Sequence, residues 1–277
     1  MHATILTTLT DPFAGGIMQR ALLEIVILAL VGGALGCWIV LQELSYGAES
    51  LAHGMFPGLV VAALAGVPLL LGGAAGILVA ALAIALAGRI PAIGRDNAVA
   101  VVVTTLFGLG ALLALSPDVP PGIQELLFGD VLGTSGSDLI AGAALAAVVL
   151  AALWLMHWRL LAVGFDRTSA RSVGASPLVA DALLLVLLAI AVLVAVQGLG
   201  NLLVVAVLVA PAAAARLICR RLLPMMAAAV AIAVVAGLAG LYLSYYANVA
   251  AGASVAGLMV AAYLLARLGA LVTTVRA

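Results

Sequence analysis

The chain has 277 residues, of which 67% are hydrophobic and 8% are charged, and its mean hydropathy is +1.37. Soluble domains carry about 25% charged residues, so this composition excludes an ordinary soluble domain and indicates an integral membrane protein. The formal net charge is +0, which gives no electrostatic reason to expect a nucleic-acid partner.

Long apolar segments follow one another along the chain, each of about 20 residues, the length that a helix needs to cross the hydrocarbon core of a bilayer. Strands of a membrane barrel would instead alternate over about ten residues. We therefore predict an all-α fold, a polytopic membrane helix bundle with about eight or nine transmembrane segments. The candidate segments are Ile17–Val40, Tyr46–Ala65, Leu69–Ala87, Ala98–Leu115, Leu139–His157, Val179–Val196, Leu199–Leu217, Met225–Tyr245 and Ala253–Leu271. The lower count applies if the sixth or seventh segment, which have almost no loop between them, is re-entrant.

The basic residues predict the orientation of the bundle. All 11 are arginine, and alternation of the segments places every one except Arg20 on the side of the loop from Arg159 to Arg171. The positive-inside rule makes that side cytoplasmic. The opposite side carries the acidic residues Asp11, Asp118, Glu125, Asp130 and Asp138.

The stretch from Leu44 to Gly58 holds the most informative polar residues. Glu49 and His53 are four residues apart, so on a helix they share one face, about one turn from each other. Pro57 has no backbone N–H and leaves the carbonyl of His53 free. A carboxylate, an imidazole and a carbonyl suit a divalent metal ion. A helix-capping acid beside an interfacial histidine fits the same spacing equally well.

A second informative stretch is the loop from Arg159 to Pro177. A short helix is predicted from Phe165 to Val173, with Asp166 near its start and Gly174 as its stop signal. Such a helix could dock into a groove on a soluble protein, although the residues alone favour an ordinary connecting helix.

Other polar residues are assigned structural roles. Glu24 and Glu43 flank the first apolar segment and are expected to be solvated end residues. Gln197 and Asn201 bracket a tight turn, where they are expected to satisfy backbone groups. Pro211 is expected to kink the seventh segment, and Pro57 and Pro211 are the two candidates for a gating hinge. The segment 116–137 is expected to form an interfacial or re-entrant helix on the outer side.

Four regions of the sequence, in order along the chain, carry a resemblance to a known family. They are GAESLAHGMFPG (47–58), IQELLFGDVLGTSGSDL (123–139), FDRTSARSVGASP (165–177), and VQGLGNLLVVAVLVAPAAAARL (196–217) followed by LYLSYYANVAAGASV (241–255). Through these motifs the chain resembles the membrane-spanning permease subunits of bacterial ABC importers for zinc, manganese and iron(II). The likeness runs from roughly Ala21 to Leu268.

The resemblance implies a multi-pass permease of the bacterial cytoplasmic membrane. It implies a homodimer that works with cytoplasmic ATP-binding-cassette ATPase subunits and an extracytoplasmic metal-binding protein. The whole chain, 1–277, would form one transmembrane domain, with a short tail over about 1–16 and a coupling loop over about 159–177. No permanent cofactor is implied, because the metal is the cargo.

The family's functional residues map onto this sequence by motif. Glu49 and His53 match the metal pathway at the dimer interface, and Asp166, Ala170 and Gly174 match the coupling residues. Glu49 stands where the family usually carries Asp, so the charge is kept on a longer arm, and Ala48 stands where Gly is usual. Because a histidine takes part and few hard oxygen ligands are in view, zinc is the favoured cargo, ahead of manganese or iron(II).

Two other kinds of transporter remain as alternatives, a permease for siderophores or corrinoids and a secondary transporter that works alone. An enzyme is not expected. The sequence has no His-Glu-x-x-His motif, and with no lysine it cannot supply the Gly-Lys-Ser/Thr loop that binds nucleotide phosphates.

Overall fold

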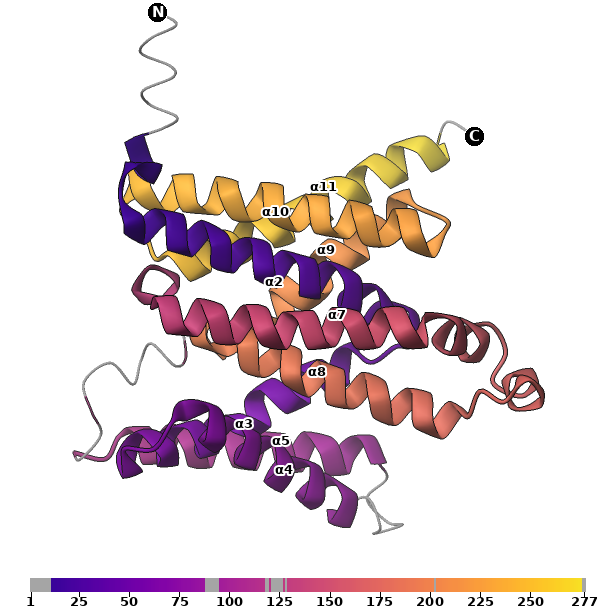
Figure 1. Ribbon diagram of the computed structural model, residues 1–277, viewed down its shortest axis with the longest axis horizontal. Helices are drawn as coiled ribbons and strands as arrows, with labels where there is room; N and C mark the ends of the chain where they lie inside the picture. The colour runs from indigo at the N-terminus through magenta and orange to yellow at the C-terminus, as the bar shows by residue number, and fades with distance from the viewer. Residues whose placement is uncertain are drawn as a thin grey trace, which may run out of the picture.

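The computed structural model describes residues 11–87, 95–117, 120, 127, 129–201 and 203–275. Within these ranges the secondary structure is helical, with nine α-helices and no strands (Figure 1). The α-helices are α2 (Gly16–Leu41), α3 (Ser45–Ala65), α4 (Leu69–Ala87), α5 (Arg95–Ala114), α7 (Gly136–Phe165), α8 (Pro177–Leu199), α9 (Val204–Ile218), α10 (Leu222–Ala247) and α11 (Ala251–Val275). The short 3-10 helices are η1 (Asp11–Ala14), η2 (Val131–Gly133) and η3 (Ser169–Val173). Every predicted apolar segment coincides with one of the α-helices, which confirms the all-α bundle.

The number of helices able to span a bilayer is lower than predicted. By length and composition, 6 of the described helices qualify: α2, α3, α7, α8, α10 and α11. Shorter apolar stretches occur in the other three, at Leu69–Ile84, Val99–Ala114 and Val204–Ile218. The seventh segment was predicted to begin at Leu199, but α8 continues to that residue and α9 begins only at Val204. Gly200, which has φ 71°, ends α8 and turns the chain.

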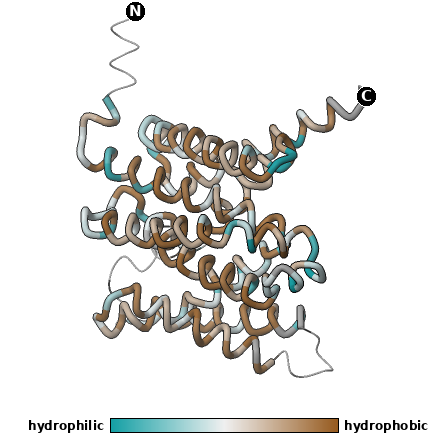
Figure 2. The backbone as a smooth tube through the Cα atoms, turned by 45° about the vertical axis from the view of Figure 1, so that its right-hand side comes forward, coloured by the Kyte–Doolittle hydropathy of each residue, from teal (hydrophilic) through white to brown (hydrophobic). Residues whose placement is uncertain are grey.

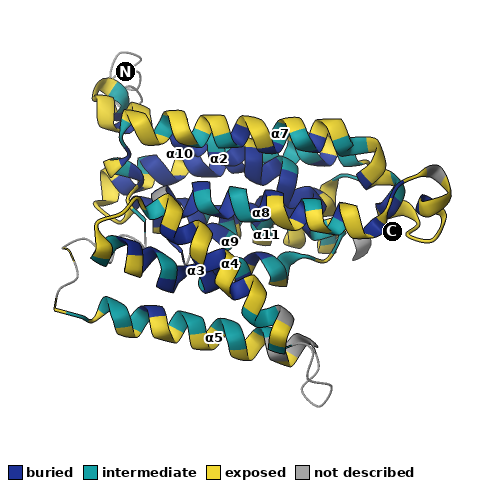
Figure 3. Ribbon diagram, turned by 60° about the horizontal axis from the view of Figure 1, so that its bottom comes forward, coloured by how far each residue is buried: buried dark blue, intermediate teal, exposed yellow. Residues whose placement is uncertain are grey.

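The helices fall into two groups that α7 and α8 connect. Figure 1 shows α3, α4 and α5 together at the bottom of the view, and α2, α9, α10 and α11 together at the top. Helix α2 lies at the centre, and Figure 3 shows it largely buried, whereas α5 and α7 have exposed faces along their length. The largest buried side chains of α2 are Ile25, Leu35, Trp38 and Ile39.

Small residues allow the helices of the α3–α5 group to approach closely. Helices α3 and α4 meet at Gly76, where an added Cβ would lie 2.6 Å from the carbonyl oxygen of Met55 and 2.9 Å from its Cα. Only glycine fits such a contact between two backbones. In lipid, where apolar surface alone does not drive helices together, close van der Waals packing of this kind holds a bundle together.

Successive helices run in alternate directions, so their ends form two opposite faces. The ends of α2, α7 and α9 lie toward the right of Figure 1, together with the starts of α3, α8 and α10. Hydrophobic residues follow the length of the helices, and hydrophilic ones gather near the ends (Figure 2). The right-hand face carries Arg159, Arg167, Arg171 and the cluster from Arg216 to Arg221, and is referred to below as the arginine face.

Candidate functional site

Glu49, His53 and Pro57 all lie on α3, the first two in the half of that helix nearer the arginine face and Pro57 just past its midpoint. The helix runs without a break from Ser45 to Ala65, with Pro57 inside it, and ends at Gly66 in the left-handed conformation (φ 66°, ψ 24°). Glycine accepts this conformation without strain, and the Gly66 N–H caps the last turn. Pro57 is buried, and Gly110 of α5 packs directly on it, since an added Cβ there would lie 2.9 Å from the Pro57 nitrogen.

His53 is held between α3 and α5 by aromatic packing. Its ring stacks on Phe107 with a centroid distance of 5.0 Å and an interplanar angle of 29°, and Phe107 in turn lies 5.5 Å from the ring of Phe56. The Nδ1 atom of His53 is buried and has no hydrogen-bond partner among the described residues. Buried polar atoms are normally paired, so this nitrogen is available to form a hydrogen bond or to coordinate a ligand.

Glu49 lies one turn before His53 and is exposed in the single chain. Across the described ranges, its carboxylate makes no hydrogen bond or ion pair with another residue. Together the pair presents one imidazole and one carboxylate on a single helix face, as the spacing predicted. The alternative role of Glu49, a helix-capping acid, does not apply, because the N-cap position of α3 is Leu44.

One chain does not supply a complete set of metal ligands from its described part. No group of ≥ 3 His, Cys, Asp or Glu side chains is placed there to hold a metal ion. Tetrahedral zinc takes four ligands, and manganese or iron takes more. A metal at Glu49 and His53 would therefore need donors from another molecule, from the backbone or from water.

The loop between α7 and α8 is built by the three residues that the motif singled out. Asp166 caps the end of α7 and accepts hydrogen bonds from the backbone N–H of Thr168 (2.8 Å) and from the Ser169 hydroxyl. The hydrogen bond from Ser169 is the main cause that lowers the pKa of the Asp166 carboxyl below its ordinary value. The carboxylate is therefore charged at neutral pH, as an acceptor of these bonds should be.

Ala170 and Gly174 complete the loop. The Ala170 side chain is buried, and its carbonyl accepts the N–H of Ala175 at 2.9 Å. Gly174 has φ 76° and ψ 14°, and ends the 3-10 helix η3. Arg167 ties the loop to α8 through an ion pair with Asp181, with 2.6 Å between the nitrogen and oxygen atoms.

The predicted helix from Phe165 to Val173 is thus partly wrong. Phe165 is the last residue of α7, which is longer than predicted, and the separate helix covers only Ser169–Val173. The stop at Gly174 is confirmed. The separate helix begins later than predicted because the Asp166 side chain accepts hydrogen bonds from the residues that follow it. These bonds form a turn between α7 and η3.

Pro211, the second hinge candidate, is buried within α9. Its role, like that of Pro57, stays a prediction. Among other sequence-based predictions, the interfacial helix over 116–137 lies partly outside the described residues, which within this segment are 116, 117, 120, 127 and 129–137 and include η2.

Glu24 and Asn201 differ from the sequence-based prediction. Glu24 is buried within α2, where it accepts a hydrogen bond from Thr134 and lies directly against the backbone of Gly198. It is not a solvated end residue, whereas Glu43 is exposed as expected. Asn201 is fully buried, yet neither polar atom of its side chain has a hydrogen-bond partner in the described part of the chain. The sequence carried one signal for Glu24, since it lies eight residues inside an apolar helix.

Comparison with known proteins identifies the family. The model of the ABC 3 transport family matches residues 15–270. The chain belongs to this family.

Named relatives of this ABC 3 family chain include membrane subunits of metal transport systems. The chain is 30% identical over 258 residues to a Haemophilus influenzae protein named "Probable iron transport system membrane protein", covering 93% of this chain and 95% of the relative. It is 30% identical over 237 residues to the manganese transport system membrane protein MntC of Listeria monocytogenes, covering 86% of this chain and 85% of the relative. These matches confirm the resemblance to permeases of metal ABC importers.

A solved structure agrees with the ABC 3 family fold. The chain is similar to a chain of PsaBC from Streptococcus pneumoniae, solved in complex with a Fab, with a TM-score of 0.86 and 27% sequence identity. The similarity covers 96% of this chain and 95% of that chain. Together with its apolar helices, the family places this permease in the bacterial inner membrane as a multi-pass protein.

Proposed function

We propose that the chain is the permease subunit of an ATP-driven importer, and that it carries a divalent transition metal into the cytoplasm past Glu49 and His53. The observation that carries this proposal is the pair itself. An exposed carboxylate and an imidazole lie one turn apart on α3, and the buried imidazole Nδ1 has no hydrogen-bond partner in the described part of the chain. Relatives of the chain are named as membrane proteins of iron and manganese transport systems. Polar groups of this kind inside a membrane are costly unless they serve a ligand.

The incomplete ligand set supports a homodimer. If α3 faces a two-fold axis, which is the commonest symmetry of oligomers, a second copy supplies the same pair. Two carboxylates and two imidazoles then surround the path, a set that suits zinc and tolerates manganese or iron with added water. The two negative charges also offset much of the cost of dehydrating a dication.

The cargo is a divalent first-row metal. The names of the relatives favour manganese or iron, while the imidazole donors at the path suit zinc, the metal that the sequence favours. A metal competition assay decides among the three. The complex with its ATPase and binding protein is placed in proteoliposomes, and the metal taken up from an equimolar mixture is measured by mass spectrometry.

We assign the energy for transport to separate partners. ATPase subunits would dock on the loop around η3. Asp166 and Gly174 shape the turns of this loop. Its exposed residues include Thr168, Ser169, Arg171 and Ser172. An extracytoplasmic binding protein would deliver the metal at the opposite face. Uptake that continues without any ATPase would favour the secondary transporter instead.

Mutation of the pair tests the pathway directly. Glu49→Gln and His53→Ala should each lower ATP-driven metal uptake in proteoliposomes by at least about tenfold, because each removes a donor from the path, whereas basal ATP hydrolysis stays the same. Glu43→Gln and His157→Ala are matched controls, since they make the same substitutions elsewhere in the chain. Uptake at the unmodified level in both pathway variants contradicts the assignment.

A further inference from the structure

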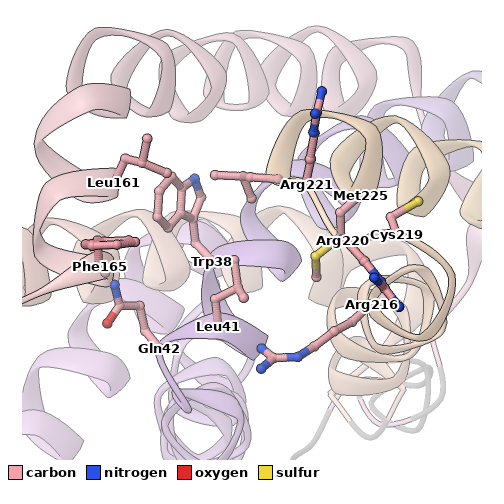
Figure 4. Close-up of a pocket in the computed structure, with 12 residues that line it drawn as sticks. Trp38, Leu41, Gln42, Leu161, Phe165, Arg216, Cys219, Arg220, Arg221 and Met225 are labelled. Atoms are coloured by element: carbon pink, nitrogen blue, oxygen red, sulfur yellow. The ribbon is translucent and has the colours of Figure 1, made fainter.

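A cavity of about 530 Å³ lies at the arginine face, away from Glu49 and His53. Its walls come from the end of α2, the end of α7 and the connection between α9 and α10, and Figure 4 shows the side chains around it. The volume lies within the range of about 300–1,000 Å³ that small-molecule sites occupy.

The cavity is positively charged on one side. Arg216, Arg220 and Arg221 all line it, and none of its lining residues is acidic. Arg216 makes one long hydrogen bond, from Nη1 to the Val40 carbonyl oxygen at 3.5 Å. In the ranges that the structure describes, none of the three arginines forms an ion pair. Three arginine side chains that form no ion pair with described residues therefore border one space.

The start of α10 adds donors to the same space. Its N-cap residue is Arg221, which makes no side-chain capping hydrogen bond, and Leu222, the first residue of the helix, lines the cavity. The first N–H groups of a helix have no partner within it, and the helix dipole favours an anion there. The N-terminus of this 26-residue helix thus supports the charge of the arginines.

An unpaired donor lies in the wall of the cavity. Trp38 is 1% exposed and lines the cavity, and its indole Nε1 has no hydrogen-bond partner among the described residues. Figure 4 shows this nitrogen on the edge of the ring that faces the arginine-bearing connection. A buried N–H without an acceptor costs about 1–3 kcal/mol, so an oxygen-rich ligand in the cavity would satisfy it.

The other side of the cavity is apolar and exposed. Phe165 is 94% exposed, Leu41 is 39% exposed and Leu161 is 37% exposed. The cavity therefore combines a cationic side with an apolar side at the cytoplasmic end of the bundle. Basic pockets between transmembrane helices at that level bind the headgroups of anionic lipids.

We propose that this cavity binds an anionic phospholipid of the inner leaflet, with its phosphate among Arg216, Arg220, Arg221 and the start of α10, and its acyl chains against Phe165 and Leu161. A lipid is favoured over a soluble protein because apolar and cationic surfaces meet here at the depth where phospholipid headgroups lie. The site is independent of the metal pathway.

Lipid binding to the purified complex tests the proposal. The permease with its ATPase is delipidated, and native mass spectrometry follows titration with phosphatidylglycerol, phosphatidylcholine or inorganic phosphate. One phosphatidylglycerol per permease chain should bind at least about tenfold more tightly than phosphatidylcholine. An arginine near an anionic headgroup is worth about fivefold in affinity, so the double variant R220Q/R221Q should bind phosphatidylglycerol about 25-fold more weakly.

The matched control is Arg159→Gln, which removes an exposed arginine of the same face that does not line the cavity. Its affinity for phosphatidylglycerol should stay within about twofold of the unmodified chain. Equal binding of the two lipids, or unchanged binding in the double variant, overturns the proposal. Phosphate binding as tight as that of the lipid would show a free-anion site instead. If the R220Q/R221Q variant lost its ATPase but still bound phosphatidylglycerol fully, the cavity would be a protein-docking surface. This result would also overturn the proposal.

Discussion

The carboxyl group of Glu24 is buried among packed helices. We therefore expect its removal to lower the free energy of unfolding. Glu24→Ala removes the acceptor of the Thr134 hydroxyl and leaves space against Gly198. The hydroxyl keeps the Val131 carbonyl as a second acceptor at 3.0 Å, so we expect a loss of about 1 kcal/mol from the lost hydrogen bond and a further cost from the space left behind. A lower Tm of the detergent-solubilised protein measures it. The same change at exposed Glu43 should leave the Tm nearly unchanged, and equal shifts in the two variants would contradict the assigned role.

At the scale of residues, the sequence predicted placement on helix faces better than burial. Glu49 and His53 share a face because the period of a helix fixes it. The stacking of His53 on Phe107 was not predictable, because it depends on how α5 packs against α3. The burial of Glu24 was missed for the same reason, since its partner Thr134 is 110 residues away in the chain.

Among the elements, α3 and α4 depend on glycine where their backbones meet. Gly76→Ala places a Cβ 2.6 Å from the Met55 carbonyl oxygen and forces the helices apart, at a cost of about 1–3 kcal/mol. Gly108→Ala is the matched control, because an added Cβ there meets no atom of the described residues within 4 Å. It should keep or raise the Tm, since alanine favours a helix by up to about 1 kcal/mol over glycine. Equal Tm values for the two variants would refute the close contact.

The loop between α7 and α8, the proposed coupling loop, depends on the backbone conformation of one glycine. No atom of the described residues lies within 4 Å of a Cβ added to Gly174, so within this part of the chain only its φ of +76° opposes a side chain. Gly174→Ala should cost about 1–2 kcal/mol locally and weaken association with the ATPase, measured as co-purification and stimulated ATP hydrolysis. Gly174→Asn should restore much of both, because asparagine tolerates this conformation. Identical behaviour of the two variants would exclude a role for the turn.

The elements themselves were largely predictable, and their ends were not. Runs of apolar residues located each of the nine described α-helices. The boundary between α8 and α9 was misplaced because hydropathy continues through Leu199, whereas the chain turns at Gly200. The η3 helix was predicted too long because the Asp166 side chain opens a turn that a helical pattern does not reveal.

For the whole molecule, the arginines predict orientation in the membrane. In a variant with Cys37 and Cys219 replaced by serine, a cysteine at Ser137 should react with a membrane-impermeant maleimide in intact spheroplasts. A cysteine at Ser172 should react only after the membrane is opened. Both positions are exposed and lie at opposite ends of α7, so the reverse pattern of labelling would show the inverted orientation.

The position of His53 along α3 has a consequence for how a charged cargo arrives. Twelve residues separate it from Ala65, or about 18 Å of helix rise, and every side chain of α3 over that length is free of oxygen, nitrogen and charge. If the proposed metal pathway runs along this part of α3, an ion that enters from the Ala65 end meets no side-chain oxygen or nitrogen on that wall and keeps its hydration shell. Entry along such an apolar wall then depends on water filling that part of the proposed pathway, as in pores that are gated by dewetting.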